Sequence, residues 1–271
     1  MNWVEGRNCL YFMKIGFYDS GLGGLVILKA VAKELPMYDY YYYGDTANLP
    51  YGDKSEEEIY FLATTAMDYL FKEGCSLVII ACNSASADTA RKIQNEYLPL
   101  RYPDRKVLGV IIPTIEEMVK VEKSALLLCT ARTATSGKYE KELHKLKHKG
   151  TLKTVAVPEL VPLIEKGNII AAEEIASDTI ETYGEGREVV VLGCTHYTKL
   201  KQELRKKFPN KKIISQDEVI PNKLKTYLLA HPEIESKLSR GSERKIHLTE
   251  HRPDYDKVLQ QLLGGVMVEE D

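Results

Sequence analysis

Two cysteines in this chain of 271 residues follow short apolar runs and precede polar residues. Cys82 lies in VIIACNSASA, residues 78–87, and Cys194 lies in VVVLGCTHY, residues 189–197. In an open α/β sheet, ligands bind beyond the carboxyl ends of the strands, where we expect both thiols to lie. A helix that begins just after a thiol lowers the pKa of that thiol from about 8.5 toward neutrality, which makes it a usable base. The two cysteines are therefore candidate acid/base groups.

The two cysteines are related by an internal repeat. They lie 112 residues apart, and a shift of about that size places KIGFY on LLLCT, YYYYG on TVAVP and VIIACNS on VVLGCTH. The helix predicted from Ser55 falls on the helix predicted from Ile169. This pattern indicates a diverged duplication of one α/β unit. Two such lobes, related by an approximate two-fold axis, would bring the cysteines together across a cleft.

Short apolar runs alternate with longer amphipathic stretches, which predicts parallel sheets with helices on their faces. The predicted strands span residues 14–18, 39–43, 77–82, 106–112, 125–129, 153–157, 188–192 and 212–214. Ser55 and Glu58 predict a capping box at the start of the clearest helix, which Gly74 closes. We expect an α/β fold of two pseudo-symmetric lobes, each a mainly parallel sheet flanked by helices, with the active site between them.

The repeat also predicts the domain boundaries. We expect residues 1–12 to be a tail or the product of an upstream start. Residues 13–105 together with 217–271 are predicted to form the first lobe, and residues 106–216 the second.

Composition excludes several classes of function. The formal charge of −2 shows no basic excess to bind nucleic acid, and the apolar runs are far shorter than the ~20 residues of a membrane helix. Five scattered cysteines form neither a disulfide framework nor a CxxC metal site, and they suit a reducing cytoplasm. Cys9, Cys75 and Cys129 are predicted to fill space as small buried residues. We therefore expect a cytoplasmic protein that needs neither nucleic acid nor membrane.

Two equivalent thiols facing one cleft indicate a nearly symmetric reaction. Inversion of a carbon centre takes a proton from one face and returns one to the other, which requires one base and one acid. A hydrolase needs a single nucleophile, whereas this chain has two candidates.

Five motifs in order carry a family resemblance. They are YDSGLGG at 18–24, GDTANLPYG at 44–52, CNSASA at 82–87, LVPLIEKG at 160–167 and LGCTHY at 192–197. With the paired cysteines, the chain resembles glutamate racemases, the cofactor-independent enzymes that make D-glutamate for bacterial cell walls. It departs from the family pattern at Ser84, where threonine is common, and at Thr198 and Lys199, where proline and leucine are usual.

The resemblance implies a role for each matching residue. Cys82 would act on D-glutamate and Cys194 on L-glutamate, with Asp19 beside the first thiol and His196 beside the second. The substrate-binding positions would be Asp19, Ser20, Pro50, Tyr51, Gly52, Asn83, Ser84 and Thr195. Asp45 matches a further acidic position near the pocket. The resemblance implies no cofactor and no metal, and it leaves a homodimer open.

Alternatives from the same residues stay open. The chain could be a racemase for aspartate or another amino acid, an amidohydrolase that uses Cys82 or Cys194 alone, or a binding protein of racemase descent without catalysis. GLGG lacks the GxGxxG spacing, so we expect a close backbone approach there rather than a dinucleotide loop. HLTEH at 247–251 satisfies a zinc-protease pattern, but Pro253 favours the end of a strand and a new helix there.

Overall fold

The computed structural model describes residues 13–253, 255–256, 259–260 and 267–269. The predicted tail, residues 1–12, and Cys9 within it lie outside the described residues. In the described part of the chain, two parallel sheets form, with strand orders β10-β9-β2-β1-β3-β4 and β6-β5-β7-β8. The strands are β1 (Lys14–Asp19), β2 (Tyr40–Gly44), β3 (Cys75–Ile80), β4 (Lys106–Gly109), β5 (Ala125–Cys129), β6 (Leu152–Ala156), β7 (Val189–Gly193), β8 (Lys212–Ser215), β9 (Arg244–Leu248) and β10 (Met267–Glu269).

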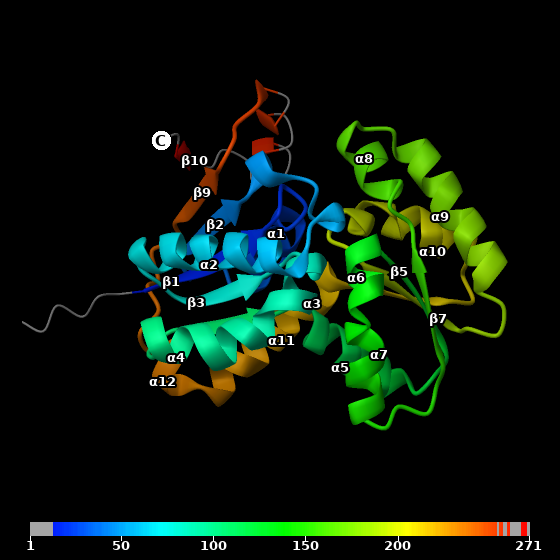
Figure 1. Ribbon diagram of the computed structural model, residues 1–271, viewed down its shortest axis with the longest axis horizontal. Coiled ribbons are helices and arrows are strands. Elements are labelled where there is room, and N and C mark those ends of the chain that lie inside the picture. The colour runs from blue at the N-terminus through cyan, green and yellow to red at the C-terminus, as the bar shows by residue number, and fades with distance from the viewer. Residues whose placement is uncertain (1–12, 254, 257–258, 261–266, 270–271) are drawn as a thin grey trace, which may run out of the picture.

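Helices cover these sheets, and the two lobes lie side by side (Figure 1). The α-helices are α1 (Leu25–Glu34), α2 (Glu56–Lys72), α3 (Asn83–Lys92), α4 (Leu98–Arg101), α5 (Ile111–Val121), α6 (Ala131–Ser136), α7 (Lys138–Lys145), α8 (Leu160–Glu165), α9 (Ile169–Tyr183), α10 (Lys201–Lys207), α11 (Gln216–Ala230) and α12 (Pro232–Glu235). Shorter helical segments are η1 (Thr46–Asn48), η2 (Tyr51–Asp53), η3 (Ile93–Tyr97) and η4 (His196–Leu200).

The predicted duplication is confirmed by the order of the strands. The run β2-β1-β3-β4 in the first sheet corresponds to β6-β5-β7-β8 in the second. In both runs the strand that ends just before a candidate cysteine, β3 or β7, lies beside the first strand of its repeat. The α/β class with two mainly parallel sheets is therefore as predicted, and β9 and β10 extend the first sheet beyond the repeat.

Alternation of side chains explains why both faces of the first sheet are covered. Ile15 and Phe17 of β1 point to a cluster with α1 and α11, while Tyr18 points to the opposite cluster with α2 and α3. Successive side chains of a strand point to opposite faces, and parallel sheets are buried on both. The helix α2 begins as predicted, because Ser55 and Glu58 form the reciprocal capping box.

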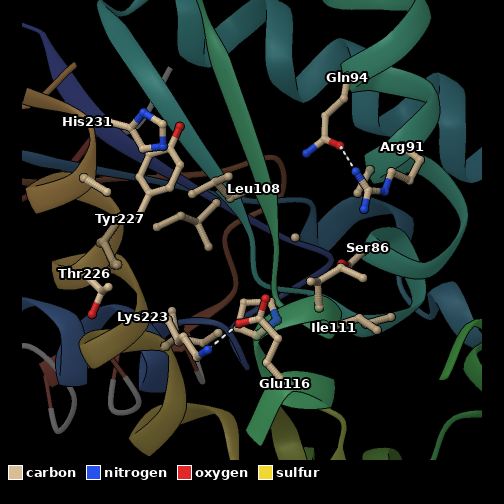
Figure 2. A pocket seen from close by; sticks show the side chains of 18 of the residues that line it. Ser86, Arg91, Gln94, Leu108, Ile111, Glu116, Lys223, Thr226, Tyr227 and His231 are labelled. Carbon is tan, nitrogen blue, oxygen red and sulfur yellow. Dashed lines mark hydrogen bonds and ion pairs between the residues drawn. The ribbon is translucent and has the colours of Figure 1, made fainter. Parts of the chain in front are cut away.

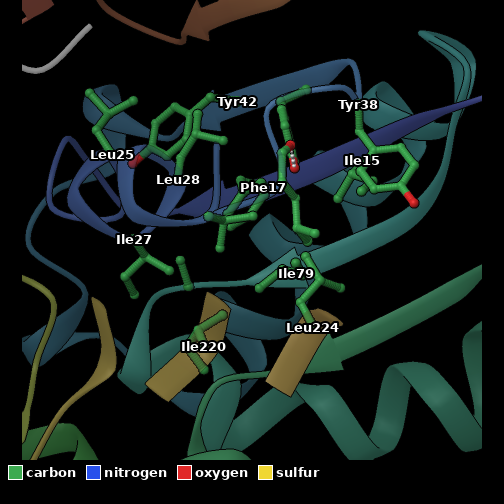
Figure 3. Packing of buried hydrophobic residues seen from close by; sticks show 14 of the residues in the cluster. Ile15, Phe17, Leu25, Ile27, Leu28, Tyr38, Tyr42, Ile79, Ile220 and Leu224 are labelled. Atoms are coloured by element: carbon green, nitrogen blue, oxygen red, sulfur yellow. Dashed lines mark hydrogen bonds between the residues drawn. The ribbon is translucent and has the colours of Figure 1, made fainter. Parts of the chain in front are cut away.

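Two helices cross between the lobes. The strand β4 belongs to the first sheet, but the following helix α5 buries Ile111 and Ile115 in the core of the second lobe. The strand β8 belongs to the second sheet, but α11 returns to the first lobe, where Ile220 and Leu224 lie against the β1–β3 face (Figure 3). Each crossing helix thus covers the sheet that its preceding strand does not join.

This crossing corrects two predicted boundaries. Residues 106–109 pair with β3, so the second lobe begins after Gly109 rather than at residue 106. The strand predicted for 106–112 also ends early, because the helix α5 already begins at Ile111. A run of apolar residues does not distinguish a buried strand from the first turn of a buried helix.

The HLTEH stretch is the end of a strand, as expected. The strand β9 ends at Leu248, and the ring of His247 stacks on that of Tyr69 with centroids 4.3 Å apart. His247 and His251 therefore do not share a turn of helix. No helix in the described part of the chain is long and apolar enough to cross a membrane.

Two adjacent leucines in α11 test how this helix holds the first lobe. Leu228 is 3% exposed in the core, and Leu229 is 78% exposed. We expect Leu228→Ala to lower the free energy of unfolding by about 2–5 kcal/mol, because it removes buried apolar contacts and leaves a cavity. Leu229→Ala should change it by less than about 0.5 kcal/mol. Urea denaturation of both variants measures the difference, and equal losses would contradict this packing.

Candidate active site

Cys82 and Cys194 line the same cavity, which has a volume of about 420 Å³. Cys82 follows β3 and caps the start of α3, while Cys194 follows β7 and precedes η4. Each cysteine is 6% exposed. The carboxyl ends of the two equivalent strands therefore meet at one cavity between the lobes, as the duplication predicted.

Most of the site residues predicted from the sequence line this cavity. They are Ser20, Pro50, Tyr51, Gly52, Cys82, Asn83, Ser84, Cys194, Thr195 and His196. Asp19 and Asp45 lie behind the wall. Asp19 is fully buried and accepts a hydrogen bond from the Thr195 hydroxyl at 3.4 Å, and Asp45 accepts one from the Tyr51 hydroxyl at 2.5 Å.

Cys194 begins a row of three hydrogen-bonded side chains. Its Sγ lies 3.8 Å from Nδ1 of His196, and Nε2 of His196 lies 3.1 Å from Oε1 of Glu165. Burial lowers the pKa of His196, but the hydrogen bonds and charges of Cys194 and Glu165 outweigh it and raise that pKa to about 10. At neutral pH the imidazole is therefore protonated and positively charged, and it lies between the sulfur of Cys194 and the carboxylate of Glu165.

The Glu165 carboxylate has further charged neighbours. Burial raises its pKa, but His196 lowers it by a hydrogen bond and by charge, and Arg252 and Lys199 lower it further, so that the net shift is downward. Lys199 stands where the family pattern has leucine. The ionised carboxylate that orients His196 is thus surrounded by cations in this chain.

Cys82 has a different environment. Burial raises its pKa to about 12, and the charge of Asp19 adds to the rise, although the Ala85 N–H and the Ser20 hydroxyl act against it. The expectation that the start of α3 brings this pKa toward neutrality is therefore wrong for the ligand-free protein. Desolvation of a thiolate and a nearby carboxylate outweigh the helix dipole. At neutral pH Cys82 is a protonated thiol.

Hydrogen bonds across the lobe interface hold the two half-sites together. The hydroxyls of Ser84 and Thr130 lie 2.9 Å apart, which joins the start of α3 to the end of β5. The amide of Asn83 exchanges two bonds of 2.8 Å with Gln216 in the crossing helix α11, and it accepts a third at 3.0 Å from Tyr139. The Asn83 side chain is therefore engaged in holding the lobes together.

Glycine permits the closest approach between the lobes. A Cβ atom on Gly23 would lie 2.4 Å from Oγ1 of Thr195 and 2.9 Å from the ring of His196. The GLGG run therefore lets the turn after β1 contact the turn that carries Cys194 and His196, consistent with the predicted close backbone approach.

Sequence reasoning missed six polar residues that line the cavity: Thr46, Asp53, Thr130, Glu165, Glu250 and Arg252. Thr130 comes directly after β5 as the predicted site residue Ser20 comes directly after β1, so the repeat could have identified it. Glu165 lies within the quoted LVPLIEKG motif, but no local signal points it at His196. Arg252 and Glu250 come from the segment after β9, whose position depends on the tertiary fold.

A second cavity of about 390 Å³ lies beside the crossing helices (Figure 2). Leu108, Ile111 and Tyr227 contribute to its mainly apolar lining, with Lys223 and Glu116 paired at its edge. A histidine, His231, lines this cavity, but neither of the two candidate thiols does. In the described residues, no group of three or more His, Cys, Asp and Glu side chains could hold a metal ion. The chemistry expected from the sequence therefore belongs to the first cavity, whose residues suit proton transfer.

Known proteins resemble this chain over most of its length. Residues 26–220 match the family described as Asp/Glu/Hydantoin racemase. The chain is 34% identical over 260 residues to a glutamate racemase from Persephonella marina, which covers 93% of this chain and 94% of that protein. A glutamate racemase from Dinoroseobacter shibae is 34% identical over 85% of this chain and 88% of that protein.

Solved structures of known proteins have the same fold as this chain. A glutamate racemase isoform from Bacillus anthracis superposes with a TM-score of 0.84 at 26% identity, covering 95% of this chain and 96% of that one. A glutamate racemase from Francisella tularensis, solved in complex with D-glutamate, gives a TM-score of 0.80 at 25% identity over 96% and 97%.

The hydrogen bond from His196 to Glu165 predicts a pH effect. The carboxylate helps to raise the pKa of His196 to about 10, so Glu165→Gln should lower that pKa. A raised pKa means that the native protein favours the protonated imidazole, and this preference is lost as pH rises through the native value. We expect NMR titration of the imidazole to show deprotonation at lower pH in the variant. Glu159→Gln, which changes an exposed carboxylate at the start of the same helix, should leave the titration unchanged.

The carboxylate of Asp19 predicts a change in thiol reactivity. Because Asp19 helps to raise the pKa of Cys82, Asp19→Asn should lower it and speed alkylation of Cys82 by iodoacetamide at a fixed pH near 8. Mass spectrometry of the peptide that contains Cys82 separates this reaction from that of Cys194. Asp53→Asn removes a charge from the same cavity lining and serves as control. Equal acceleration in both variants would contradict a specific effect of Asp19.

Proposed function

Since the chain belongs to the Asp/Glu/Hydantoin racemase family, we propose that it interconverts L-glutamate and D-glutamate by proton transfer at two thiols, without a cofactor. This is a glutamate racemase activity, an isomerase reaction that supplies D-glutamate for peptidoglycan. The observation that carries the mechanism is the pair of buried cysteines at equivalent strand ends on one cavity.

Each turnover moves two protons. In the direction from L- to D-glutamate, the thiolate of Cys194 takes the α-hydrogen and leaves its electron pair on the α-carbon, while the Cys82 thiol gives a proton to the opposite face. After this step Cys194 carries the proton from the α-carbon and Cys82 is a thiolate. Exchange of protons with water restores the starting state. In the reverse direction the two thiols exchange roles.

The neighbours of each thiol support these roles. Cys82 is protonated in the ligand-free protein, so it is ready to act as the acid. The protonated His196 lies against the sulfur of Cys194, where its positive charge faces the proton transfer, and Glu165 fixes the orientation of the imidazole. Buried charges interact more strongly than charges in water, so this positioning acts directly on the proton transfer.

The cavity suits a small dicarboxylic amino acid. Its volume of about 420 Å³ falls in the range of about 300–1,000 Å³ typical of small-molecule sites. The hydroxyls of Ser20, Ser84, Thr130 and Thr195 can bond carboxylate oxygens, and Arg252 adds a cation at the edge. Glutamate brings two carboxylates and one ammonium, and these groups need such donors and at least one acid nearby.

Equilibrium restricts how substitutions can affect the two directions. The two enantiomers have equal free energy, so kcat/KM must stay equal in both directions in every variant. Substitution of Asp19 or His196 by Asn can therefore slow the two directions unequally only in kcat, with a matching change in KM. This refines the expectation that each residue serves one thiol.

We expect the circular dichroism signal of D-glutamate to decay to zero when D-glutamate is incubated with protein that has first been treated with chelator. In heavy water, NMR should show deuterium at the α-carbon. Exchange of aspartate in place of glutamate would assign another substrate, and ammonia released from glutamine without α-exchange would indicate an amidohydrolase that uses a single cysteine.

Replacement of either thiol should abolish racemisation, because each turnover uses both. We expect Cys82→Ala and Cys194→Ala each to slow racemisation by roughly a hundredfold or more. Cys75→Ala, which truncates a buried cysteine in the core of the first lobe, is the control and should keep the activity. Substantial racemisation by Cys82→Ala would disprove the mechanism with two bases.

The cellular setting follows from the same proposal. Synthesis of D-glutamate for the cell wall fits the cytoplasmic location expected from the cysteines. The homodimer that the sequence leaves open stays a prediction.

A further inference from the structure

A buried tyrosine beside the site has no role in the proton transfers described above. Tyr18 lies next to Asp19 near the end of β1, and its side chain is fully buried in the cluster that also contains Cys82. Its hydroxyl lies 2.7 Å from the hydroxyl of Tyr51, which lines the cavity. Tyr18 itself does not line the cavity, so any effect on substrate must act through another residue.

The hydrogen bonds of these two hydroxyls have a definite direction. The Tyr51 hydroxyl donates its one proton to Oδ2 of Asp45 at 2.5 Å. Its oxygen is then available as an acceptor, so the hydroxyl of Tyr18 must be the donor in the bond between the tyrosines. Burial raises the pKa of Tyr18 well above its ordinary value, which keeps this donor protonated throughout the working pH range. The chain therefore runs from Tyr18 through Tyr51 to Asp45.

Asp45 is itself anchored. Its Oδ1 accepts hydrogen bonds from Nδ2 of Asn48 at 2.8 Å and from the hydroxyl of Thr249 at 3.0 Å. Thr249 follows β9, and the backbone N–H of Ala47 also donates to its hydroxyl at 3.0 Å. One end of the segment 45–53 is thereby attached to the end of β9.

The other part of this segment is attached to β1 through Tyr51. Residues 46, 47 and 49–53 form one wall of the cavity, and they are built from two short turns, η1 and η2. Such turns have few backbone hydrogen bonds of their own, so side-chain bonds must hold the wall in place. The Tyr18–Tyr51 bond is such an attachment, and it joins the wall to the strand that carries Asp19.

We propose that Tyr18 is a positioning residue whose hydroxyl fixes Tyr51, and through it the cavity wall of residues 46–53, in the geometry that binds substrate. The proposal rests on the proposed racemase function and adds a residue to it. A wall that contacts substrate equally before and during proton transfer supplies binding energy common to both states, and loss of the attachment would remove part of it. Such a loss raises KM and leaves kcat nearly unchanged.

The test is Tyr18→Phe, which removes one hydroxyl and keeps the ring. We expect KM for both enantiomers of glutamate to rise roughly fivefold, the effect of about one lost hydrogen bond, with kcat changed less than about twofold. Tyr40→Phe is the matched control, because its hydroxyl is also buried and donates at 2.8 Å to the carbonyl of Leu35, away from the cavity. An unchanged KM in Tyr18→Phe, or equal rises in both variants, would overturn the proposal.

A second variant tests whether Tyr18 acts through Tyr51. Tyr51→Phe removes the acceptor, so Tyr18→Phe should raise KM no further in that background. Independent, multiplying effects of the two substitutions would overturn the proposed route. If the unaltered protein racemises glutamate and Tyr18→Phe behaves like it, this inference alone fails. If the unaltered protein exchanges no α-hydrogen of glutamate, the proposed function fails and this inference falls with it.

Discussion

A proton can leave one face of a carbon atom and return to the other only when a base and an acid are held on opposite sides of it. Duplication of an α/β unit meets this requirement, because strand ends that are equivalent in two lobes face each other across the interface. Cys82 and Cys194 follow the equivalent strands β3 and β7, and both line the same cavity. The helices α5 and α11 cross between the lobes and so maintain that arrangement.

The topology is nearly symmetric, but the charges are not. Asp19 ends β1, where its charge helps to raise the pKa of Cys82, while β5 of the second lobe ends in the uncharged Cys129. His196 follows Cys194 by two residues, where the first lobe has Ser84. One thiol is therefore kept protonated by burial and a carboxylate, and the other contacts a protonated imidazole. Two thiols at equivalent places in the fold thus lie in different electrostatic environments, because the repeat preserves the strands but not the charged side chains around each thiol.

Buried polar contacts set the relative position of the lobes. The bonds of Asn83 with Gln216 and of Ser84 with Thr130 cross the interface, and Gly23 allows the turn after β1 to touch Thr195. Polar groups removed from water must be paired, so a shifted arrangement of the lobes would leave several of them unsatisfied. The proposed attachment of Tyr51 to Tyr18 applies the same principle to one wall of the cavity.

The sequence by itself determined the α/β class, the duplication, most strand positions and the two thiols with most of their neighbours, because periodicity and repeated motifs are local properties. It misplaced the start of the second lobe, since membership of β4 in the first sheet depends on pairing with β3. It also missed Glu165 and Arg252, and it predicted a lowered pKa for Cys82, which is raised to about 12. Burial and contacts between distant segments set those properties, and only the tertiary structure decides them.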